Sequence, residues 1–92
     1  MTDAKFELIV APTARRQLAE QLPEAVAFAA YEFIVGPLLE NPHRVGKPLH
    51  APLEGRYSAR RGTYRVIYRI DDAELRVIVL GVFARSDAYR SR

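Results

Sequence analysis

Residues 63 to 71, TYRVIYRID, alternate between apolar and arginine-bearing positions with a period of two. Successive side chains of a β-strand point to opposite faces, so this period predicts a strand whose two faces differ in chemistry. The apolar face takes Tyr64, Val66, Tyr68 and Ile70. The opposite face takes Arg65, Ile67 and Arg69. The segment therefore predicts a sheet with one apolar face and one face that presents arginine.

The segments on either side predict two further strands. One strand covers residues 54 to 60 and is joined to the strand at 63 to 71 by a tight turn at Arg61-Gly62. The other covers residues 75 to 84 and follows a second turn at Asp71-Asp72. Strands joined by such turns form an antiparallel meander. In the earlier strand one face takes Arg56, Ser58 and Arg60. Two neighbouring strands therefore present arginines from the same surface.

The N-terminal half predicts one strand and two helices. The strand covers residues 6 to 10 and ends at Pro12. Thr13 can cap a short helix in which apolar residues recur at positions 14, 18 and 22. A second helix runs from residue 24 to about residue 40, and Gly36-Pro37 should kink it or separate its last turn.

The length of 92 residues allows one hydrophobic core. We therefore expect a single domain over residues 1–92. Its class is α+β: an N-terminal strand, two helices and a three-stranded antiparallel meander, which complete one mainly antiparallel sheet.

The second helix is apolar on nearly every side, because its segment AVAFAAYEFIVGPLL contains one charge, Glu32. One face must pack on the sheet, and two readings of the remaining surface stay open. Scattered exposed apolar side chains are normal on soluble proteins. Contiguous apolar exposure is instead typical of a surface that docks another protein.

Charge is unevenly divided along the chain. Residues 1–40 carry three basic and six acidic side chains, whereas residues 41–92 carry eleven basic and five acidic ones. Of the fourteen basic residues twelve are arginine, whose planar guanidinium suits phosphate. The basic half indicates binding to a polyanion, with nucleic acid favoured over simple solvation.

The chain lacks the residues that cysteine chemistry, metal binding, secretion or membrane insertion would need. There is no cysteine, which fits a reducing cytosol and excludes disulfides and thiolate chemistry. His43 and His50 lie in a proline-rich loop without an acidic ligand between them, so we expect neither a metal nor a cofactor. The N-terminus does not read as a signal peptide, and no uncharged stretch is long enough to span a membrane. We expect a cytoplasmic protein.

Arginine and tyrosine remain as candidate chemistry. The meander permits Arg60, Arg65 and Arg85 to converge, and Tyr89 would share the side of Arg85 if residues 85–89 form a helical turn. Cleavage of RNA by its own 2′-hydroxyl needs a base, positive charge on the phosphorane and a proton donor for the leaving oxygen, and it needs no metal. The same arginines could also bind phosphate without chemistry, and Tyr89 could simply pack its ring.

The segments NPHRVGKPLHAPLEGRYSARRGTYRVIYRIDD and VLGVFARSDAYR resemble the RelE/ParE superfamily of bacterial type II toxins, and the RelE-type branch most closely. That resemblance implies a toxin that inhibits translation by cutting mRNA on the ribosome. The resemblance implies that Arg65 contacts the scissile phosphate and that Arg85 either protonates the leaving group or clamps the phosphate. It also implies that Tyr89 is the base and that Arg60 fills a basic position on the neighbouring strand. The side chains expected to bind RNA around this set are Arg44, Lys47, Arg56, Ser58, Arg61 and Arg69.

The chain departs from the branch at two positions, because Ser58 stands where some relatives have lysine and Ala84 where many have histidine. The resemblance implies a cognate antitoxin as partner, the ribosome and mRNA as targets, and operator DNA as a site for the toxin–antitoxin complex, with no membrane. Two alternatives stay open: a ParE-like inhibitor of DNA gyrase and a module that binds antitoxin without catalysis.

Overall fold

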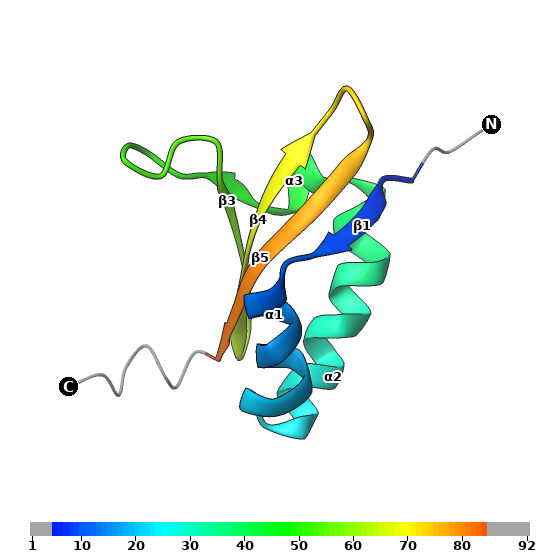
Figure 1. The fold of residues 1–92 in the computed structure, drawn as a ribbon, viewed down its shortest axis with the longest axis vertical. Helices are drawn as coiled ribbons and strands as arrows, with labels where there is room; N and C mark the ends of the chain where they lie inside the picture. Colours follow the sequence, from blue (N-terminus) through cyan, green and yellow to red (C-terminus); the bar gives the residue numbers. More distant parts are fainter. Residues whose placement is uncertain (1–4, 85–92) are drawn as a thin grey trace.

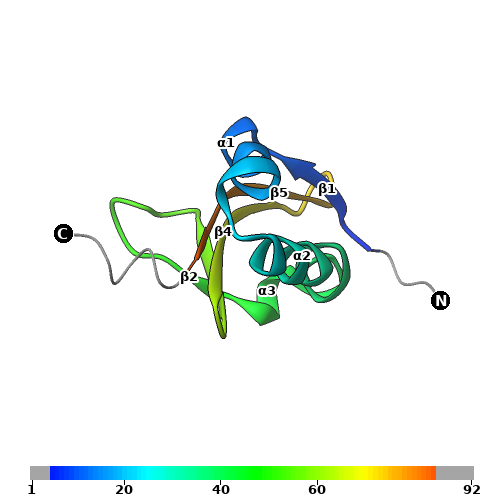
Figure 2. The same cartoon turned by 90° about the horizontal axis from the view of Figure 1, so that it is seen from below.

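The computed structural model describes residues 5–84. A five-stranded sheet carries helices on one face (Figures 1 and 2). Its strands follow the spatial order β1-β5-β4-β3-β2. They are β1 (Glu7–Val10), β2 (Lys47–Pro48), β3 (Tyr57–Arg61), β4 (Tyr64–Asp71) and β5 (Arg76–Ala84). The first strand lies parallel to β5 and every other pairing is antiparallel, so the expected mainly antiparallel α+β sheet is confirmed.

The sequence predicted four strands, and the fifth is β2, which pairs Lys47 with Ser58. Two residues are too few to show a period, so the sequence carried no signal for this strand. The three meander strands lie within a few residues of their expected limits.

The helices differ in detail from the prediction. The first, α1 (Pro12–Arg16), runs into a π-helical segment η1 (Gln17–Gln21). It begins with Pro12 after Ala11 in the capping position, so the expected cap by Thr13 was wrong. Proline suits this place because the first helical N–H has no intrahelical acceptor.

The second helix, α2 (Glu24–Phe33), runs into the π-helical segment η2 (Ile34–Leu38), which contains Pro37. A proline ring clashes with the preceding turn of an α-helix, and a wider turn accommodates it. The predicted disturbance at Gly36-Pro37 therefore takes the form of a π-helical segment. A short helix α3 (Pro42–Val45) follows.

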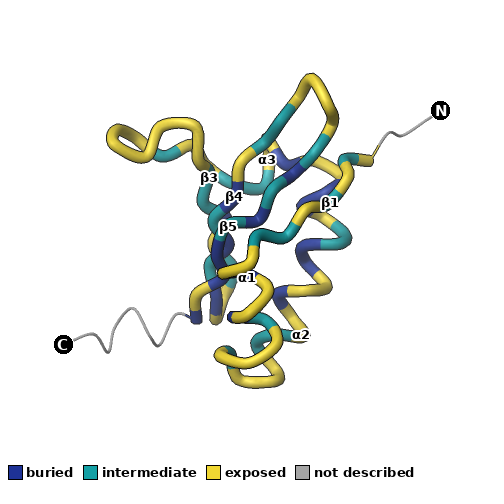
Figure 3. The backbone as a smooth tube through the Cα atoms, in the orientation of Figure 1, coloured by how far each residue is buried: buried dark blue, intermediate teal, exposed yellow. Residues whose placement is uncertain are grey.

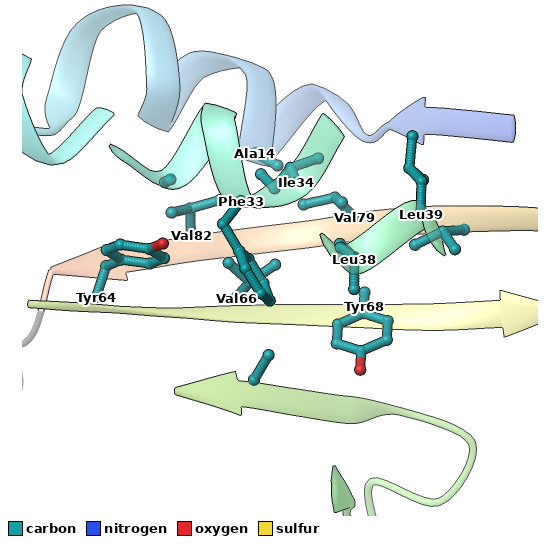
Figure 4. Packing of buried hydrophobic residues seen from close by; sticks show 13 residues of the cluster. Ala14, Phe33, Ile34, Leu38, Leu39, Tyr64, Val66, Tyr68, Val79 and Val82 are labelled. Atoms are coloured by element: carbon teal, nitrogen blue, oxygen red, sulfur yellow. The ribbon is translucent and has the colours of Figure 1, made fainter. Parts of the chain in front are cut away.

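The core lies between the helices and one face of β4 and β5 (Figure 4). Val66 and Tyr68 of β4 are fully buried there, which confirms the predicted apolar face. The helices contribute several buried side chains: Ala14, Ala30, Phe33, Ile34 and Leu38. The edge strand β2 and residues 50–56 are exposed by contrast, and the other edge strand, β1, alternates between exposed and half-buried residues (Figure 3).

A β-bulge interrupts β5. Ile67 pairs with Gly81, but its neighbour Tyr68 pairs with Val79, so Leu80 is an extra residue in β5. The bulge changes the phase of the strand, and Val82 returns to the core. The Val82 N–H donates to the buried Gln17 Oε1 over 2.7 Å. The π-helical segment η1 thus satisfies a backbone donor beside the bulge.

Tyr68 joins the sheet to the segment around α3. Its hydroxyl donates to the Pro42 carbonyl oxygen over 2.7 Å, and its ring stacks on that of Tyr57 with centroids 5.5 Å apart. Within residues 5–84, no helix is long and apolar enough to cross a membrane.

Candidate nucleic-acid interface

Two arginines lie opposite each other on the sheet face that bears no helix. Arg60 of β3 pairs with Arg65 of β4, and Arg65 pairs in turn with Phe83 of β5. Neighbouring strands are about 4.8 Å apart, so these three residues form a row across the sheet. Like charges directly opposite each other destabilise a sheet. The pairing therefore indicates a surface made to bind an anion.

The guanidinium of Arg65 carries the clearest sign of a missing partner. Its Nε atom is buried, and no residue from 5 to 84 accepts a hydrogen bond from it. Leaving a buried donor unpaired costs about 1 to 3 kcal/mol, and more for a charged group. An ionised oxygen, of a phosphate or a carboxylate, is the type of acceptor that this charged donor binds most strongly.

Other expected RNA-binding residues surround this row. Lys47 of β2 pairs with Ser58 of β3. Ser58 lies two residues before Arg60 on β3, so it is on the same face of the sheet. Arg69 is exposed on the same face of β4 as Arg65, about 13 Å along the strand. Arg56 lies just before β3 and lines a cavity on this face.

Arg61 and Arg44 are not brought to the row. The guanidinium carbon of Arg61 lies 4.5 Å from the centroid of the Phe33 ring, so the side chain packs toward the helical layer. Its Nη1 donates to the Arg60 carbonyl oxygen over 2.7 Å. Arg44 is exposed on α3. A role of these two residues in RNA binding stays a prediction.

Arg85 and Tyr89 lie outside the described residues, so their convergence with the arginine row also stays a prediction. The strand register that the prediction needs is present, because Ala84 pairs with Tyr64 at the start of β4. The chain therefore leaves β5 one residue from the row of Arg60 and Arg65.

The buried tyrosines of β4 do not suit the role of base. Burial raises the pKa of Tyr68 to about 12, and the neighbouring Tyr57 adds to the rise. Burial also raises the pKa of Tyr64, although the charge of Arg61 opposes it. Both hydroxyls instead donate to backbone carbonyl oxygens, those of Pro42 and Ala29.

His43 and Asp72 form a contact that no sequence pattern predicted. His43 Nε2 lies 2.8 Å from Asp72 Oδ1, and His43 Nδ1 lies 3.5 Å from the Tyr57 hydroxyl. The contact joins α3 to the turn after β4, at the opposite end of that strand from Arg65. The adjacent Asp71 makes a local turn bond, accepting from the Glu74 N–H over 3.1 Å.

A second surface lies on the helical layer. An apolar groove of about 650 Å³ runs between α1, η1 and α2 beside β1. Phe28 and Tyr31 line it and remain 65% and 52% exposed. Two charged side chains, Arg15 and Glu24, also line it. The exposed aromatic rings favour the docking interpretation of the second helix over simple solvation.

Solved structures place this architecture among small toxins. The structure is similar to a chain of the toxin–antitoxin complex RelBE2 from Mycobacterium tuberculosis, with a TM-score of 0.85 and 46% identity over 89% of this chain and 100% of that one. It is also similar in fold to the isolated RelE toxin of E. coli, with a TM-score of 0.70 and 24% identity over 91% and 90% of the two chains.

Sequence comparisons define the family. Residues 8–89 match the family described as the ParE toxin of the type II toxin–antitoxin system, parDE. The protein called Toxin RelE of M. tuberculosis is 51% identical over 96% of this chain and 90% of its own length. Toxin RelG of the same organism is 53% identical over 85% and 88%. The chain belongs to the ParE toxin family of type II toxin–antitoxin systems, which confirms the RelE/ParE resemblance.

Proposed function

We propose that this toxin is an mRNA endonuclease that cuts on the ribosome and thereby inhibits translation. The observation that carries the proposal is the arginine row, in which Arg60 faces Arg65 and the buried Nε of Arg65 has no acceptor within residues 5–84. The similarity to the proteins called RelE and RelG supports the RelE-type activity.

In the proposed reaction, the 2′-oxygen of the RNA attacks the adjacent phosphorus and the bond to the 5′-oxygen breaks. The products are a 2′,3′-cyclic phosphate and a free 5′-hydroxyl. The phenolate form of Tyr89, which the neighbouring arginine charges favour, accepts the proton of the 2′-hydroxyl, and Arg85 supplies a proton or positive charge to the leaving oxygen. Arg65 stabilises the charge that grows on the phosphorane, and Arg60 binds the flanking phosphate. No metal takes part in this scheme.

The proposal is tested by mapping mRNA 5′ ends after brief induction of the toxin. New ends should appear within translated codons in cells that express the wild type, and Arg65→Ala should remove them. Arg76→Ala is a matched control, because it removes an arginine from the far end of the sheet, where Arg76 contacts Glu7 over 3.6 Å. New ends of equal abundance in the Arg65 variant would contradict the assignment.

Gyrase inhibition is the second candidate, because the matched family is described by the name ParE. A supercoiling assay with purified gyrase separates the two functions. We expect relaxed plasmid to be supercoiled at the same rate with and without toxin. Inhibition of supercoiling without new mRNA ends would favour the ParE-like activity and leave the arginine row as a binding surface.

We also propose a cognate antitoxin whose amphipathic helix fills the groove lined by Phe28 and Tyr31. A groove with exposed aromatic rings suits such a helix, and the similar chain from M. tuberculosis comes from the toxin–antitoxin complex RelBE2. The resulting complex would bind operator DNA.

Coexpression of the antitoxin should relieve growth arrest, and Phe28→Asp should weaken that relief while preserving the arrest. Full relief in the Phe28 variant would place the antitoxin elsewhere.

A further inference from the structure

A small cavity lies beside the arginine row, on the sheet face without helices. It has a volume of about 350 Å³, at the lower end of the range for small-molecule sites. Its lining is mostly apolar and comes from two parts of the chain: Ile67, Leu80, Gly81 and Phe83 of the sheet, and Leu49, Leu53 and Arg56 of the loop between β2 and β3. Figures 1 and 2 show this loop extending from the sheet away from the helices.

Gly81 makes room for the Phe83 ring at the floor of the cavity. A Cβ atom at this position would lie 2.8 Å from Cε2 and 3.0 Å from Cζ of Phe83, so the Phe83 ring rests against the glycine backbone. Phe83 nevertheless remains 39% exposed. One side of the ring is therefore packed on the strand, and an apolar aromatic surface is left accessible at the cavity.

The opposite wall is a loop with its own hydrogen bonds. The Leu49 N–H donates to the Arg56 carbonyl oxygen over 2.8 Å, and the Arg56 N–H donates to the Leu53 carbonyl oxygen over 3.1 Å. These bonds hold Leu49 and Leu53 in a closed loop above the sheet. The cavity thus has an aromatic floor and an aliphatic wall.

Positive charge borders this apolar cavity on two sides. Phe83 pairs directly with Arg65, which pairs with Arg60, and Arg56 lines the cavity itself. Along a strand, side chains of one face are about 7 Å apart, so the arginine row lies about that far from Ile67 and Gly81. A flat apolar group attached to a phosphate chain matches this arrangement, because the group fills the cavity and the phosphates bind the arginines. An apolar peptide side chain would fill the cavity but would offer the arginines no anion.

We propose that this cavity is a subsite for one nucleobase of the bound RNA, which stacks on Phe83 while its phosphates bind Arg65 and Arg60. The inference rests on the proposed RNA cleavage and names a base-binding subsite for it. Stacking on an aromatic side chain tolerates every base, and the leucine wall limits the size of the base that enters.

The test measures binding of short single-stranded RNA by fluorescence anisotropy. The RNA carries 2′-O-methyl groups, which remove the attacking hydroxyl and prevent cleavage, and it is compared with strands that have one abasic nucleotide at each position in turn. Wild-type protein should lose about 5- to 150-fold in affinity at one abasic position, the range typical of base–aromatic stacking.

Phe83→Leu keeps apolar volume but removes the ring. This variant should bind intact RNA about 5- to 150-fold more weakly and should lose little more at the abasic position. Phe83→Tyr should keep the affinity of the wild type. Ile9→Ala is the control, because Ile9 lies on the same face of the sheet, is 41% exposed and is outside the cavity.

Salt dependence separates this subsite from the arginine row. Phe83→Leu should keep the slope of log affinity against log salt, whereas Arg65→Ala should reduce its magnitude by about 0.7, the value for one phosphate contact on a single strand. The subsite assignment is wrong if Phe83→Leu binds RNA as tightly as the wild type does. It is also wrong if this variant weakens the binding of antitoxin but not the binding of RNA. In that case continued mRNA cleavage by the wild type would leave the proposed function standing. A wild type that neither binds RNA nor cuts mRNA would overturn both.

Discussion

Replacing Tyr68 with phenylalanine should change both the stability of the fold and its response to alkaline pH. The side chain is fully buried, and its hydroxyl donates to the Pro42 carbonyl oxygen over 2.7 Å. Removing one partner of a buried hydrogen bond costs about 1 to 3 kcal/mol. The ring remains and keeps its stack on Tyr57. At neutral pH we therefore expect a folded variant that is less stable by about that amount.

The pH dependence follows from the raised pKa of Tyr68. Burial raises it from 10.0 to about 12 in the folded protein. The unfolded chain releases the proton near pH 10 and the folded chain only near pH 12, so the free energy of unfolding is at its full value below pH 10 and falls as the pH rises to 12. A rise of that size corresponds to a few kcal/mol of stability, since one pKa unit is worth about 1.4 kcal/mol.

The assay is urea unfolding followed by circular dichroism from about pH 8 to about pH 12. The wild type should lose a few kcal/mol more than Tyr68→Phe over this range, so the two stability curves should converge at high pH. Tyr31→Phe, which removes a hydroxyl from an exposed side chain, should follow the wild type. An equal alkaline decline in the wild type and Tyr68→Phe would refute the assignment of this decline to Tyr68.

Three further predictions concern packing, the bulge and charge. Gly46→Ala should destabilise the fold by about 1 to 3 kcal/mol in thermal melts, because the new Cβ would overlap the Tyr68 hydroxyl and lie 3.0 Å from a backbone oxygen, whereas Gly36→Ala, with nothing within 4 Å, should be neutral or stabilising. Gln17→Leu should cost about 1 to 3 kcal/mol in urea unfolding, because a buried N–H of β5 loses its acceptor; equal stability would show that another acceptor replaces it. Arg56→Ala should reduce the magnitude of the salt slope of RNA binding by about 0.7 without slowing cleavage at saturation, and an unchanged slope would remove Arg56 from the phosphate contacts.

The parts of the fold that the sequence predicted are those with a repeating local pattern. Tyr64, Val66 and Tyr68 are buried as their alternation indicated, because one face of the strand must pack against the helices. The parallel pairing of β1 with β5 joins segments about 70 residues apart, and no local pattern encodes it. Such pairings are decided by the packing of the whole sheet.

In the candidate site, the residues with a regular local pattern were again the predictable ones. Arg60 and Arg65 share a face, as expected, because they flank one tight turn. The turn lies at Gly62-Thr63 and not at the expected Arg61-Gly62, because Arg61 still pairs with Tyr64. Phe83 was missed because the bulge at Leu80 changes the phase of β5, so simple alternation does not indicate which face it joins. Arg61 was expected beside the other arginines, but it follows Arg60 directly and packs on Phe33 in the helical layer.

The central claim is that the arginine row performs chemistry on RNA and does not merely hold it. The most direct test is the single-turnover rate of mRNA cleavage on programmed ribosomes by purified wild type and Arg65→Ala, measured over a range of toxin concentrations. If Arg65 stabilises the transition state more than the bound RNA, the saturated rate should fall by about 100-fold or more while the half-saturating concentration changes little. An unchanged saturated rate with a raised half-saturating concentration would show that Arg65 only binds phosphate, and would contradict the claim.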